Sequence, residues 1–331
     1  MLYYIPIETM EQRYTKMMNE VIMPLVDYTV YPKFEYSDTI EKWQFLDVNK
    51  TSIFKAKQLE EIAKLFYEWK IKDWDKFLVA DIFFPGIESI RYMADLQGIK
   101  VKIYWYNHAG RADPTDFVQN LWSWADITEK WYMAICDYIF VWSEFHKGLV
   151  SNYFDIDPDK IIPYWPAWSL DRVENLVSNK DIEKEDFIIM PQRLAKEKWL
   201  EEFIEFAKST DKKIITTTSW NKVDVEFPDN VEYVKVSKKE YYQYLKRARW
   251  YVSFAYQETF WYTLQEAIYY RCNILVPNRV CYPEMVPEKN LYNSTEELLE
   301  KLKCDDMTVP LEWTERHDKN YERMIDFIRN D

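Results

Sequence analysis

The amino-acid sequence predicts an α/β protein made of two Rossmann-like domains, and three observations support this fold class. The chain has 331 residues, about twice the size of one usual domain. Short apolar runs rich in Val, Ile and aromatic residues alternate with amphipathic runs of helical period, a pattern typical of parallel sheets. The alternation stops near Pro163–Pro166, gives way to a charged stretch over 171–186, and then starts again. We therefore place one domain at 1–168 and a second at 169–313.

The first half contains five predicted strands and three predicted helices. The strands are Tyr3–Ile7, Phe77–Phe84, Lys100–Tyr106, Tyr138–Val141 and Ile161–Tyr164, and the helices are Ala56–Trp69, Ile87–Leu96 and Trp131–Cys136.

The second half repeats this order. Its predicted strands are Phe187–Met190, Ile214–Thr217, Val231–Val236, Trp250–Phe254 and Asn273–Val276, and its helices are Glu197–Lys208, Lys238–Arg247 and Thr263–Arg271. Ser237 and Glu240 have the spacing of a capping box at the start of the second helix. A last helix over Thr314–Ile328, within the segment 314–331, either belongs to the second half or packs back on the N-terminal domain. Two such domains facing each other make the cleft between them the expected site.

Glycine scarcity excludes several kinds of phosphate site. The chain has only 4 glycines, and none of their spacings fits a dinucleotide fingerprint, a Walker A loop or a nucleophile elbow. A bound phosphate must therefore be neutralised by Arg and Lys side chains and by the N–H groups at helix N-termini.

Other counts narrow the class of protein. The 4 cysteines and 3 histidines lie in no metal-binding spacing, so we expect no metal. The sequence shows no signal peptide and no long apolar run, so we expect a cytoplasmic protein, in the host cytoplasm if the gene is viral, without stable membrane association. The net charge of −13 argues against nonspecific adhesion to nucleic acid through a global field, but not against a local basic cleft.

One loop between a strand and a helix carries two glutamates. Glu258 follows the strand that ends near Phe254, and Glu266 lies eight residues later in a helix that begins near Thr263. The helix start, at Thr263 and Leu264, offers bare N–H groups to a diphosphate, while carboxylates accept hydrogen bonds from sugar hydroxyls. The alternatives stay open: Thr263 and Glu266 also fit a capping box, and Glu258 also fits a solvated loop acid.

A second loop carries two cations. Arg193 and Lys198 are five residues apart, between the strand Phe187–Met190 and the next helix. They fall at the carboxyl edge of the predicted sheet, where open α/β sheets bind ligands. A solvated loop cation and a helix-face lysine are the alternative interpretation.

Together these two segments resemble the retaining GT-B glycosyltransferases of the glycogen-synthase-like and sucrose-synthase-like group. Members carry an R-x-x-x-x-K pattern after a strand and an E-x(7)-E motif downstream, and Arg193, Lys198, Glu258 and Glu266 occur in that order here. The resemblance covers the second half well and the first half only in outline. The glycines usual on either side of the aromatic after the first glutamate are replaced by Thr259 and Trp261.

The resemblance implies a role for each residue and for each domain. The second domain would bind a nucleotide-sugar donor, with a UDP-sugar expected, and the first domain would bind the acceptor. Arg193 and Lys198 would neutralise the leaving diphosphate, Glu258 would hold the sugar hydroxyls and Glu266 the ribose. The Thr263 and Leu264 amides would bind phosphate.

The implied mechanism needs no cofactor and no metal. The sugar would be transferred by front-face substitution, with the cations stabilising the departing diphosphate. The one Asp-x-Asp, at Asp155 and Asp157, precedes a proline and is interpreted as a turn. Similar enzymes often carry a histidine near the donor sugar, and His108 is the candidate here, a solvated or structural histidine being the alternative.

Two features of the first half bear on the acceptor. The opening segment, from Tyr4 to Thr15, looks like the N-terminus of phage-encoded glycosyltransferases thought to decorate hydroxymethylated pyrimidines in DNA. Several aromatic residues of the first half are candidates to stack on an extruded base, or else form core: Trp105, Tyr106, Trp122, Trp124 and Trp131. A DNA acceptor is the first hypothesis, a surface polysaccharide or lipid-linked sugar the second, and an inactive nucleotide-sugar-binding protein the third.

Overall fold

A computed structural model describes the chain over residues 1–9, 14–33, 48–80, 83–164, 168–191, 200–218, 226–259 and 262–331. The chain forms two compact units. Unit 1 comprises Met1–Trp168 together with Lys319–Asp331, and unit 2 comprises Ser169–Asp318. The division after Trp168 falls at the position where the sequence analysis placed the domain boundary.

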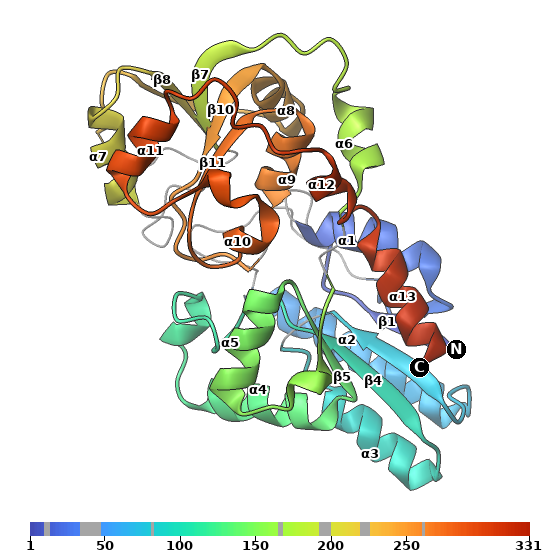
Figure 1. Cartoon of the computed structure of the whole chain (residues 1–331). Helices are drawn as coiled ribbons and strands as arrows, with labels where there is room; N and C mark the ends of the chain where they lie inside the picture. The colour runs from blue at the N-terminus through green and yellow to red at the C-terminus, as the bar shows by residue number, and fades with distance from the viewer. Residues whose placement is uncertain are drawn as a thin grey trace. The chain divides into compact units, whose positions relative to one another are not determined.

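Unit 1 is built on a six-stranded sheet with the order β2-β1-β3-β4-β5-β6, in which every pair of neighbouring strands is parallel (Figure 1). The strands are β1 (Leu2–Ile5), β2 (Tyr28–Thr29), β3 (Asp75–Val79), β4 (Val101–Tyr106), β5 (Tyr138–Val141) and β6 (Ile161–Pro163). The helices of unit 1 are α1 (Tyr14–Ile22), α2 (Val48–Tyr67), α3 (Ile87–Gln97), α4 (Trp124–Ile135), α5 (Glu144–Phe154) and α13 (Asn320–Asn330), with 3-10 turns at Met23–Leu25, Phe117–Asn120 and Pro158–Lys160.

Unit 2 repeats this design with the strand order β12-β11-β10-β7-β8-β9, again parallel between neighbours. Its strands are β7 (Glu185–Met190), β8 (Lys213–Thr218), β9 (Val231–Lys235), β10 (Ala248–Val252), β11 (Asn273–Pro277) and β12 (Leu291–Tyr292). Its helices are α6 (Leu170–Leu176), α7 (Leu200–Lys208), α8 (Lys238–Arg247), α9 (Tyr262–Tyr269), α10 (Tyr282–Met285), α11 (Thr295–Lys301) and α12 (Glu312–Glu315), with a 3-10 turn at Glu288–Asn290.

The inner strands of each sheet are buried because they are apolar on both faces, as parallel sheets require, whereas the edge strands β2 and β9 are only partly buried. In unit 1, Tyr3 of β1 stacks on Phe77 of β3 at 5.1 Å between ring centroids. In unit 2, Trp250 of β10 and Ile188 of β7 are neighbours in register and almost wholly buried. The core of each unit therefore lies along the faces of its own sheet, and the polar loops are left at the strand ends.

Several predicted boundaries were wrong. The helix predicted at Ala56–Trp69 begins at Val48, and the one predicted at Trp131–Cys136 begins at Trp124. Neither helix has a clear amphipathic pattern in the part that the prediction missed. In α4, large apolar side chains of that part face solvent. Strand β3 ends at Val79 rather than at Phe84.

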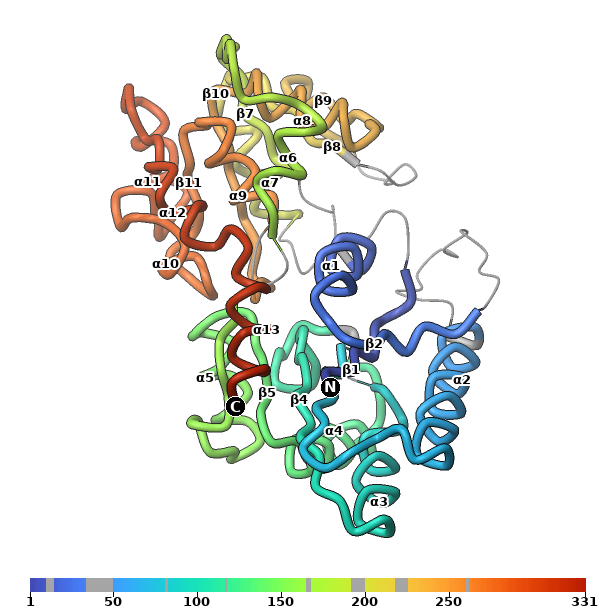
Figure 2. Tube along the Cα trace, turned by 90° about the vertical axis from the view of Figure 1, so that its right-hand side faces the viewer, coloured from blue at the N-terminus to red at the C-terminus, as the bar shows by residue number. Residues whose placement is uncertain are grey.

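The predicted terminal helix Thr314–Ile328 is two helices, α12 and α13. They are separated by a turn in which Lys319 has a φ of 52°, in the left-handed region that no continuous right-handed helix adopts. The second of them, α13, packs in unit 1. Phe327 contacts the rings of Tyr138 and Phe140 of β5, at centroid distances of 5.3 and 6.1 Å. Both chain termini accordingly lie in unit 1 (Figure 2).

The aromatic residues of the first half divide into two sets. Trp105 and Tyr106 are buried in β4, so they are core and cannot stack on a ligand base. Trp122, Trp124 and Trp131 are at least half exposed. Among the helices that the structure describes, none is both long enough and apolar enough to cross a membrane.

Candidate functional site

The loop that leaves β10 of unit 2 is anchored at its first residue. Ser253 is fully buried; its Oγ lies 2.5 Å from the hydroxyl of Tyr282, and its carbonyl accepts a hydrogen bond of 2.5 Å from the hydroxyl of Tyr292. The loop therefore starts from a rigid base at the carboxyl end of a central strand, the position at which α/β sheets bind ligands.

Arg279 fixes the next turn of this loop from the neighbouring strand end. Its guanidinium donates to the carbonyls of Phe254 and Ala255 at 2.9 and 3.2 Å, and it pairs with Glu202 of α7 at 3.1 Å. It also lies 3.4 Å from the ring centroid of Tyr256. The sequence analysis missed this residue, although its position two residues after the end of β11 was a signal that it lies at the same sheet edge.

Glu258 is half-buried further along the loop. Burial raises the pKa of the Tyr251 and Tyr282 hydroxyls well above the usual value, and the negative charge of Glu258 contributes in the same direction. Glu258 therefore lies close to these two buried phenols. A carboxylate held at the end of β10 is placed to accept hydrogen bonds from a polyhydroxylated ligand.

Helix α9 begins at Tyr262, directly after this loop. Thr263 and Leu264 are in its first turn, whose N–H groups have no acceptor within the helix. The hydroxyl of Thr263 lies 3.0 Å from that of Tyr251, which ties the helix start to β10. The partial positive charge of this helix end therefore lies at the same sheet edge as Glu258.

Glu266 is almost wholly buried in α9 and does not cap the helix. Its carboxylate accepts hydrogen bonds from the hydroxyls of Tyr241 and Tyr242 at 2.6 and 2.7 Å and from Lys238 at 2.8 Å. The capping-box interpretation is wrong because Thr263 lies inside the helix rather than before it.

Lys238 lies over the rings of Tyr241 and Tyr242, at 4.7 and 4.6 Å from their centroids. The sequence analysis did not single it out. Its pairing with Glu266 joins the start of α8 to the middle of α9, so α8 orients this carboxylate.

Arg193 and Lys198 lie outside the described residues, as does Trp261. Strand β7 ends at Met190, and the next residue that the structure describes after position 191 is Leu200, where α7 begins. Since β7 pairs with β10, the end of β7 at Met190 lies next to the strand that leads into the Glu258 loop.

His108 occupies the corresponding edge of the unit 1 sheet. Its Nε2 lies 2.7 Å from the carbonyl oxygen of Ala80, which can only accept, so this nitrogen carries the proton. The ring stacks on Tyr106 at 5.1 Å and meets the edge of Trp142 at 5.2 Å. The imidazole is therefore held in one orientation between the ends of β3 and β5.

Two buried polar residues lie close to His108. Burial, with a smaller contribution from the charge of His108, lowers the pKa of His146 to about 3, so His146 is neutral. The side-chain amide of Asn107 is fully buried and has no hydrogen-bond partner within the part of the chain that the structure describes. The sequence analysis found neither residue as a site component.

Arg111 organises the loop that follows His108. Its guanidinium pairs with Asp126 at 2.8 Å and donates to the carbonyls of Val118 and Gln119 at 3.2 and 3.3 Å. Its backbone N–H donates to the buried carboxyl group of Glu129. Burial raises the pKa of Glu129 to about 8, so this group is largely protonated at neutral pH.

Asp155 and Asp157 lie in a turn, as the sequence predicts. Asp155 ends α5 with a φ of 55°, and the side chain of Asp157 accepts from the N–H of Asp159 at 3.0 Å. Within the described ranges no three His, Cys, Asp or Glu side chains come together as metal ligands.

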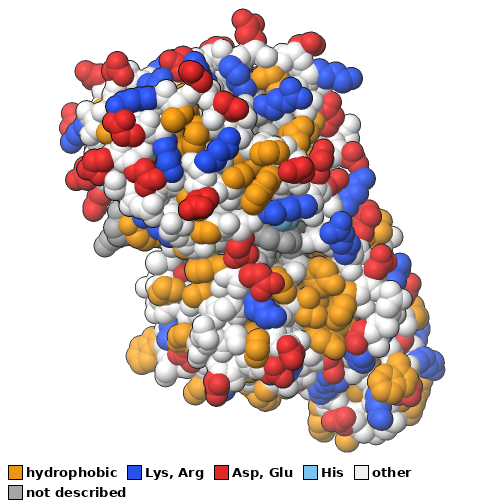
Figure 3. Space-filling model, in the orientation of Figure 1, with side chains coloured by type: hydrophobic (Ala, Val, Ile, Leu, Met, Phe, Trp, Pro, Cys, Tyr) orange, Lys and Arg blue, Asp and Glu red, His pale blue; other side chains and the backbone are white. Residues whose placement is uncertain are grey.

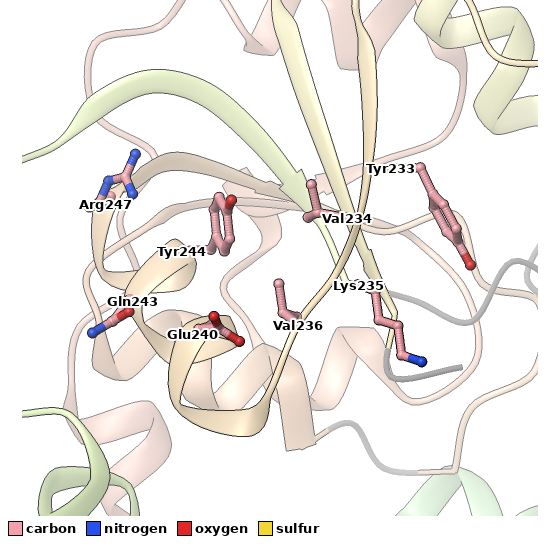
Figure 4. Close-up of a pocket in the computed structure, with 8 residues that line it drawn as sticks. All are labelled: Tyr233, Val234, Lys235, Val236, Glu240, Gln243, Tyr244 and Arg247. Carbon is pink, nitrogen blue, oxygen red and sulfur yellow. The ribbon is translucent and has the colours of Figure 1, made fainter. Parts of the chain in front are cut away.

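A separate hollow of about 470 Å³ lies between β9 and α8 of unit 2. Figure 4 shows Glu240, Gln243, Tyr244 and Arg247 reaching it from α8, opposite the residues of β9. None of the predicted site residues lines it, and Arg247 is paired with Glu185 at 2.5 Å.

Comparison with known proteins gives structural neighbours only. No protein-family model and no curated protein sequence matches the chain. HepE of Anabaena in complex with UDP-glucose is 8% identical, with a TM-score of 0.67 over 100% of this chain and 99% of that one. Sucrose-phosphate synthase from Thermosynechococcus elongatus is 11% identical, with a TM-score of 0.65 over 99% and 94% of the two chains.

Two further neighbours match the chain to different extents. The lipopolysaccharide outer core galactosyltransferase WaaB is 11% identical, with a TM-score of 0.63 over 98% and 99% of the two chains. A chain of the GtfA/B complex is 16% identical, with a TM-score of 0.58, and this chain spans only 61% of its length. The matches to HepE, sucrose-phosphate synthase and WaaB each cover at least 98% of this chain and therefore include both of its units.

The chain has the GT-B fold.

Within this GT-B fold, unit 2 brings Glu258, Thr263 and Leu264 together at the carboxyl end of β10. Glu266 lies one turn deeper, and unit 1 holds His108. Unit 2 thus has a carboxylate and a helix N-terminus at one edge of its sheet, groups that can bind sugar hydroxyls and a diphosphate respectively.

Proposed function

We propose that this chain is a retaining glycosyltransferase that takes a sugar from a nucleotide-sugar, with a UDP-sugar as the expected donor. The observation that carries the proposal is the loop from Ser253 to Glu258, which is anchored at both strand ends and leads directly into the N-terminus of α9. Structural neighbours determined with UDP and with UDP-glucose support a donor of this class.

The proposed chemistry separates charge stabilisation from sugar binding. The Thr263 and Leu264 amides bind the diphosphate, and Arg193 and Lys198 neutralise the charge that develops as it leaves. Glu258 accepts hydrogen bonds from the sugar hydroxyls. The nucleophile attacks the anomeric carbon from the face that the diphosphate leaves, so the configuration is retained, and His108 contacts the transferred sugar.

Glu266 is proposed to hold the ribose. Its carboxylate already accepts three hydrogen bonds, and a carboxylate has about four acceptor positions. A ribose hydroxyl therefore either takes the remaining position or displaces Lys238, which is more than half exposed and more easily moved than the two buried tyrosines.

For the acceptor we propose a hydroxymethylated pyrimidine base in DNA, on the similarity of the segment from Tyr4 to Thr15 to phage enzymes. A glycan or lipid-linked acceptor is the second candidate, favoured by the similarity to a lipopolysaccharide galactosyltransferase.

The test begins with donor turnover. The protein is incubated with a panel of nucleotide-sugars, and release of nucleoside diphosphate is measured for the unchanged chain, Arg193→Ala and Glu258→Gln. We expect each substitution to lower turnover about 10²- to 10³-fold, the usual effect of removing one group that stabilises the transition state. Lys239→Ala and Glu232→Gln are matched controls, because both side chains lie on the surface of unit 2.

The acceptor is tested in the same reactions. Hydroxymethylated DNA, plain DNA and lipid-linked glycans are added, and the nucleosides and glycans are analysed by mass. Sugar on hydroxymethylated nucleosides alone supports the DNA acceptor, and transfer to a glycan alone supports the second candidate. No turnover of any donor would contradict the enzyme assignment and leave an inactive binding protein.

A further inference from the structure

His146 is a buried histidine that the proposed chemistry does not use. It lies in the first turn of α5, where its backbone N–H donates to the Oγ of Ser143 at 3.1 Å. The residue is 1% exposed, so its ring does not contact a ligand directly. In keeping with such burial, Figure 3 shows hardly any histidine surface on the face in view. Any role of His146 in the reaction must be exerted through a neighbouring residue.

The ring of His146 is held as one neutral tautomer. Its Nδ1 lies 3.3 Å from the backbone nitrogen of Trp142, whose N–H can only donate, so Nδ1 carries no proton. The lowered pKa of the buried ring keeps it uncharged at neutral pH. The single ring proton therefore lies on Nε2, and the ring accepts on one edge and donates on the other.

His146 interacts with two residues that adjoin His108. The first is Trp142, which bonds to Nδ1 of His146 and whose own ring meets that of His108 edge-on at 5.2 Å between centroids. The second is Ala109, the residue directly after His108, whose backbone favours the protonated ring of His146. No described residue completes a hydrogen bond of ordinary geometry to Nε2, so the interaction with Ala109 is mainly electrostatic. Both interactions lead from α5 to the surroundings of His108.

The other contacts of His108 come from the strands. Ala80 at the end of β3 binds its Nε2, and Tyr106 of β4 stacks on its ring. His108 is itself only half-buried, unlike His146. Directly after Ala109 the chain turns at Gly110, whose φ of 104° lies in the region that favours glycine. The strands therefore hold the ring of His108, and His146 supports the start of the turn that follows it.

We propose that His146 is a positioning residue, which holds Trp142 and Ala109 so that the imidazole of His108 keeps the orientation in which it contacts the transferred sugar. The proposal rests on the role proposed above for His108 and adds the residue that supports it. Misplacing a reacting group by about 1 Å can lower a rate about 10²-fold, so the loss of such a support is measurable. A histidine that only fills the core would affect stability alone.

Three substitutions separate the two edges of the ring. His146→Asn keeps an acceptor near the position of Nδ1, His146→Gln keeps an amide near the position of Nε2, and His146→Leu removes both. His317→Leu is the matched control, because His317 is 2% exposed but lies in unit 2. Thermal unfolding of each variant checks that it folds.

The first measurement does not depend on activity. The chain has only 3 histidines, so NMR of the full chain labelled with ¹⁵N-histidine follows each ring separately. We expect His146 to be the neutral tautomer with the proton on Nε2, His146→Leu to shift the ring signals of His108, and His317→Leu to leave them unchanged. Unchanged His108 signals in folded His146→Leu would overturn the proposal, and so would a proton on Nδ1 of His146.

The second measurement is a double-mutant cycle on donor turnover, with the nucleotide-sugar that the unchanged chain turns over fastest. We expect His146→Leu to lower kcat about 10- to 100-fold and to leave KM for the donor unchanged, because the donor residues lie in unit 2. His146→Asn and His146→Gln should each restore part of the rate. In a His108→Ala background, His146→Leu should cause no further loss, because a support has no effect once the supported ring is absent.

This proposal and the proposed function fail in different ways. Losses of kcat that multiply in the double variant, or an unchanged kcat in folded His146→Leu, would overturn the positioning role while the enzyme assignment stands. If the unchanged chain turns over no donor, the proposed function fails, and shifted His108 signals would then still show that His146 orients this ring.

Discussion

Glu266 shows how one buried carboxylate depends on residues about 25 positions before it. Two tyrosine hydroxyls and one ammonium group donate to it, and both tyrosines are themselves buried. Removing one such donor leaves a buried charged acceptor incompletely satisfied, which costs more than the bond alone contributes.

We expect Tyr241→Phe to lower the free energy of unfolding by about 1.5–3 kcal/mol, the usual contribution of a hydrogen bond to a charged group. Urea denaturation measures the change. Tyr244→Phe is the control, because the ring of Tyr244 contacts Arg247 and Phe keeps that contact. Equal stability of the two variants would contradict the importance of the bond to Glu266.

Glu129 makes stability depend on pH. Its pKa is raised in the folded chain from the ordinary value of 4.5 to about 8, so between these values the folded state binds a proton that the unfolded state releases. Stability therefore falls as pH rises through this range, by at most about 1.4 kcal/mol per pH unit from this one group.

Glu129→Gln removes the proton uptake while its amide oxygen can still accept from the Arg111 N–H. We expect this variant to lose less stability than the unchanged chain when urea denaturation at pH 5.5 is compared with that at pH 8. Identical pH dependence in both proteins would show that Glu129 ionises normally.

At the scale of elements, the turn from β3 into α3 depends on a glycine for space. A Cβ added at Gly86 would lie 2.5 and 2.7 Å from the Cε1 and Cζ atoms of the Phe84 ring, and 3.0 Å from a methyl group of Leu59. The Phe84 ring is fully buried, so it has little room to move away from an added methyl group.

We expect Gly86→Ala to destabilise the chain by about 1–3 kcal/mol, the usual cost of overpacking. Gly148→Ala in α5 is the matched control, since nothing lies within 4 Å of the added Cβ. That change should be neutral or stabilise the helix by up to about 1 kcal/mol. Thermal unfolding of both variants measures these changes in stability. If Gly86→Ala leaves the stability unchanged, the Phe84 ring moves aside to accommodate the added methyl group.

At the scale of the whole molecule, the chain leaves unit 1 at Trp168 and returns to it at Lys319. The returning helix α13 buries Met324, Ile325 and Ile328 in unit 1. Asp331, directly after this helix, pairs with Lys102 of β4 at 2.5 Å. Unit 1 is therefore completed by a segment that follows all of unit 2 in the sequence.

We expect Ile328→Ala to destabilise unit 1 by about 2–5 kcal/mol, as large-to-small changes in a core do. Arg323→Ala, on the exposed face of the same helix, should have little effect. Limited proteolysis with mass analysis locates the change, and new cleavage sites should appear in unit 1 rather than in unit 2. Cleavage confined to unit 2 would contradict the assignment of α13.

Local sequence patterns determined most of the elements of this protein and excluded several kinds of site. The apolar runs at β4, β7 and β10 are strands because they are buried on both faces, and the scarcity of glycine excludes glycine-rich phosphate loops. The sequence also shows that Glu258 and Glu266 lie on either side of a helix start, because the spacing of nearby residues is a local property.

Only the tertiary structure decided what these residues touch. Nothing in the local sequence says that Tyr241 and Tyr242 hold Glu266, that Arg279 fixes the loop before Glu258, or that α13 completes unit 1. The aromatic residues make the same point: Trp105 is core and Trp124 is exposed, although both stand in apolar surroundings in the sequence. The physical reason is that burial and hydrogen bonding depend on contacts between residues far apart in the chain, which exist only once the sheets have assembled.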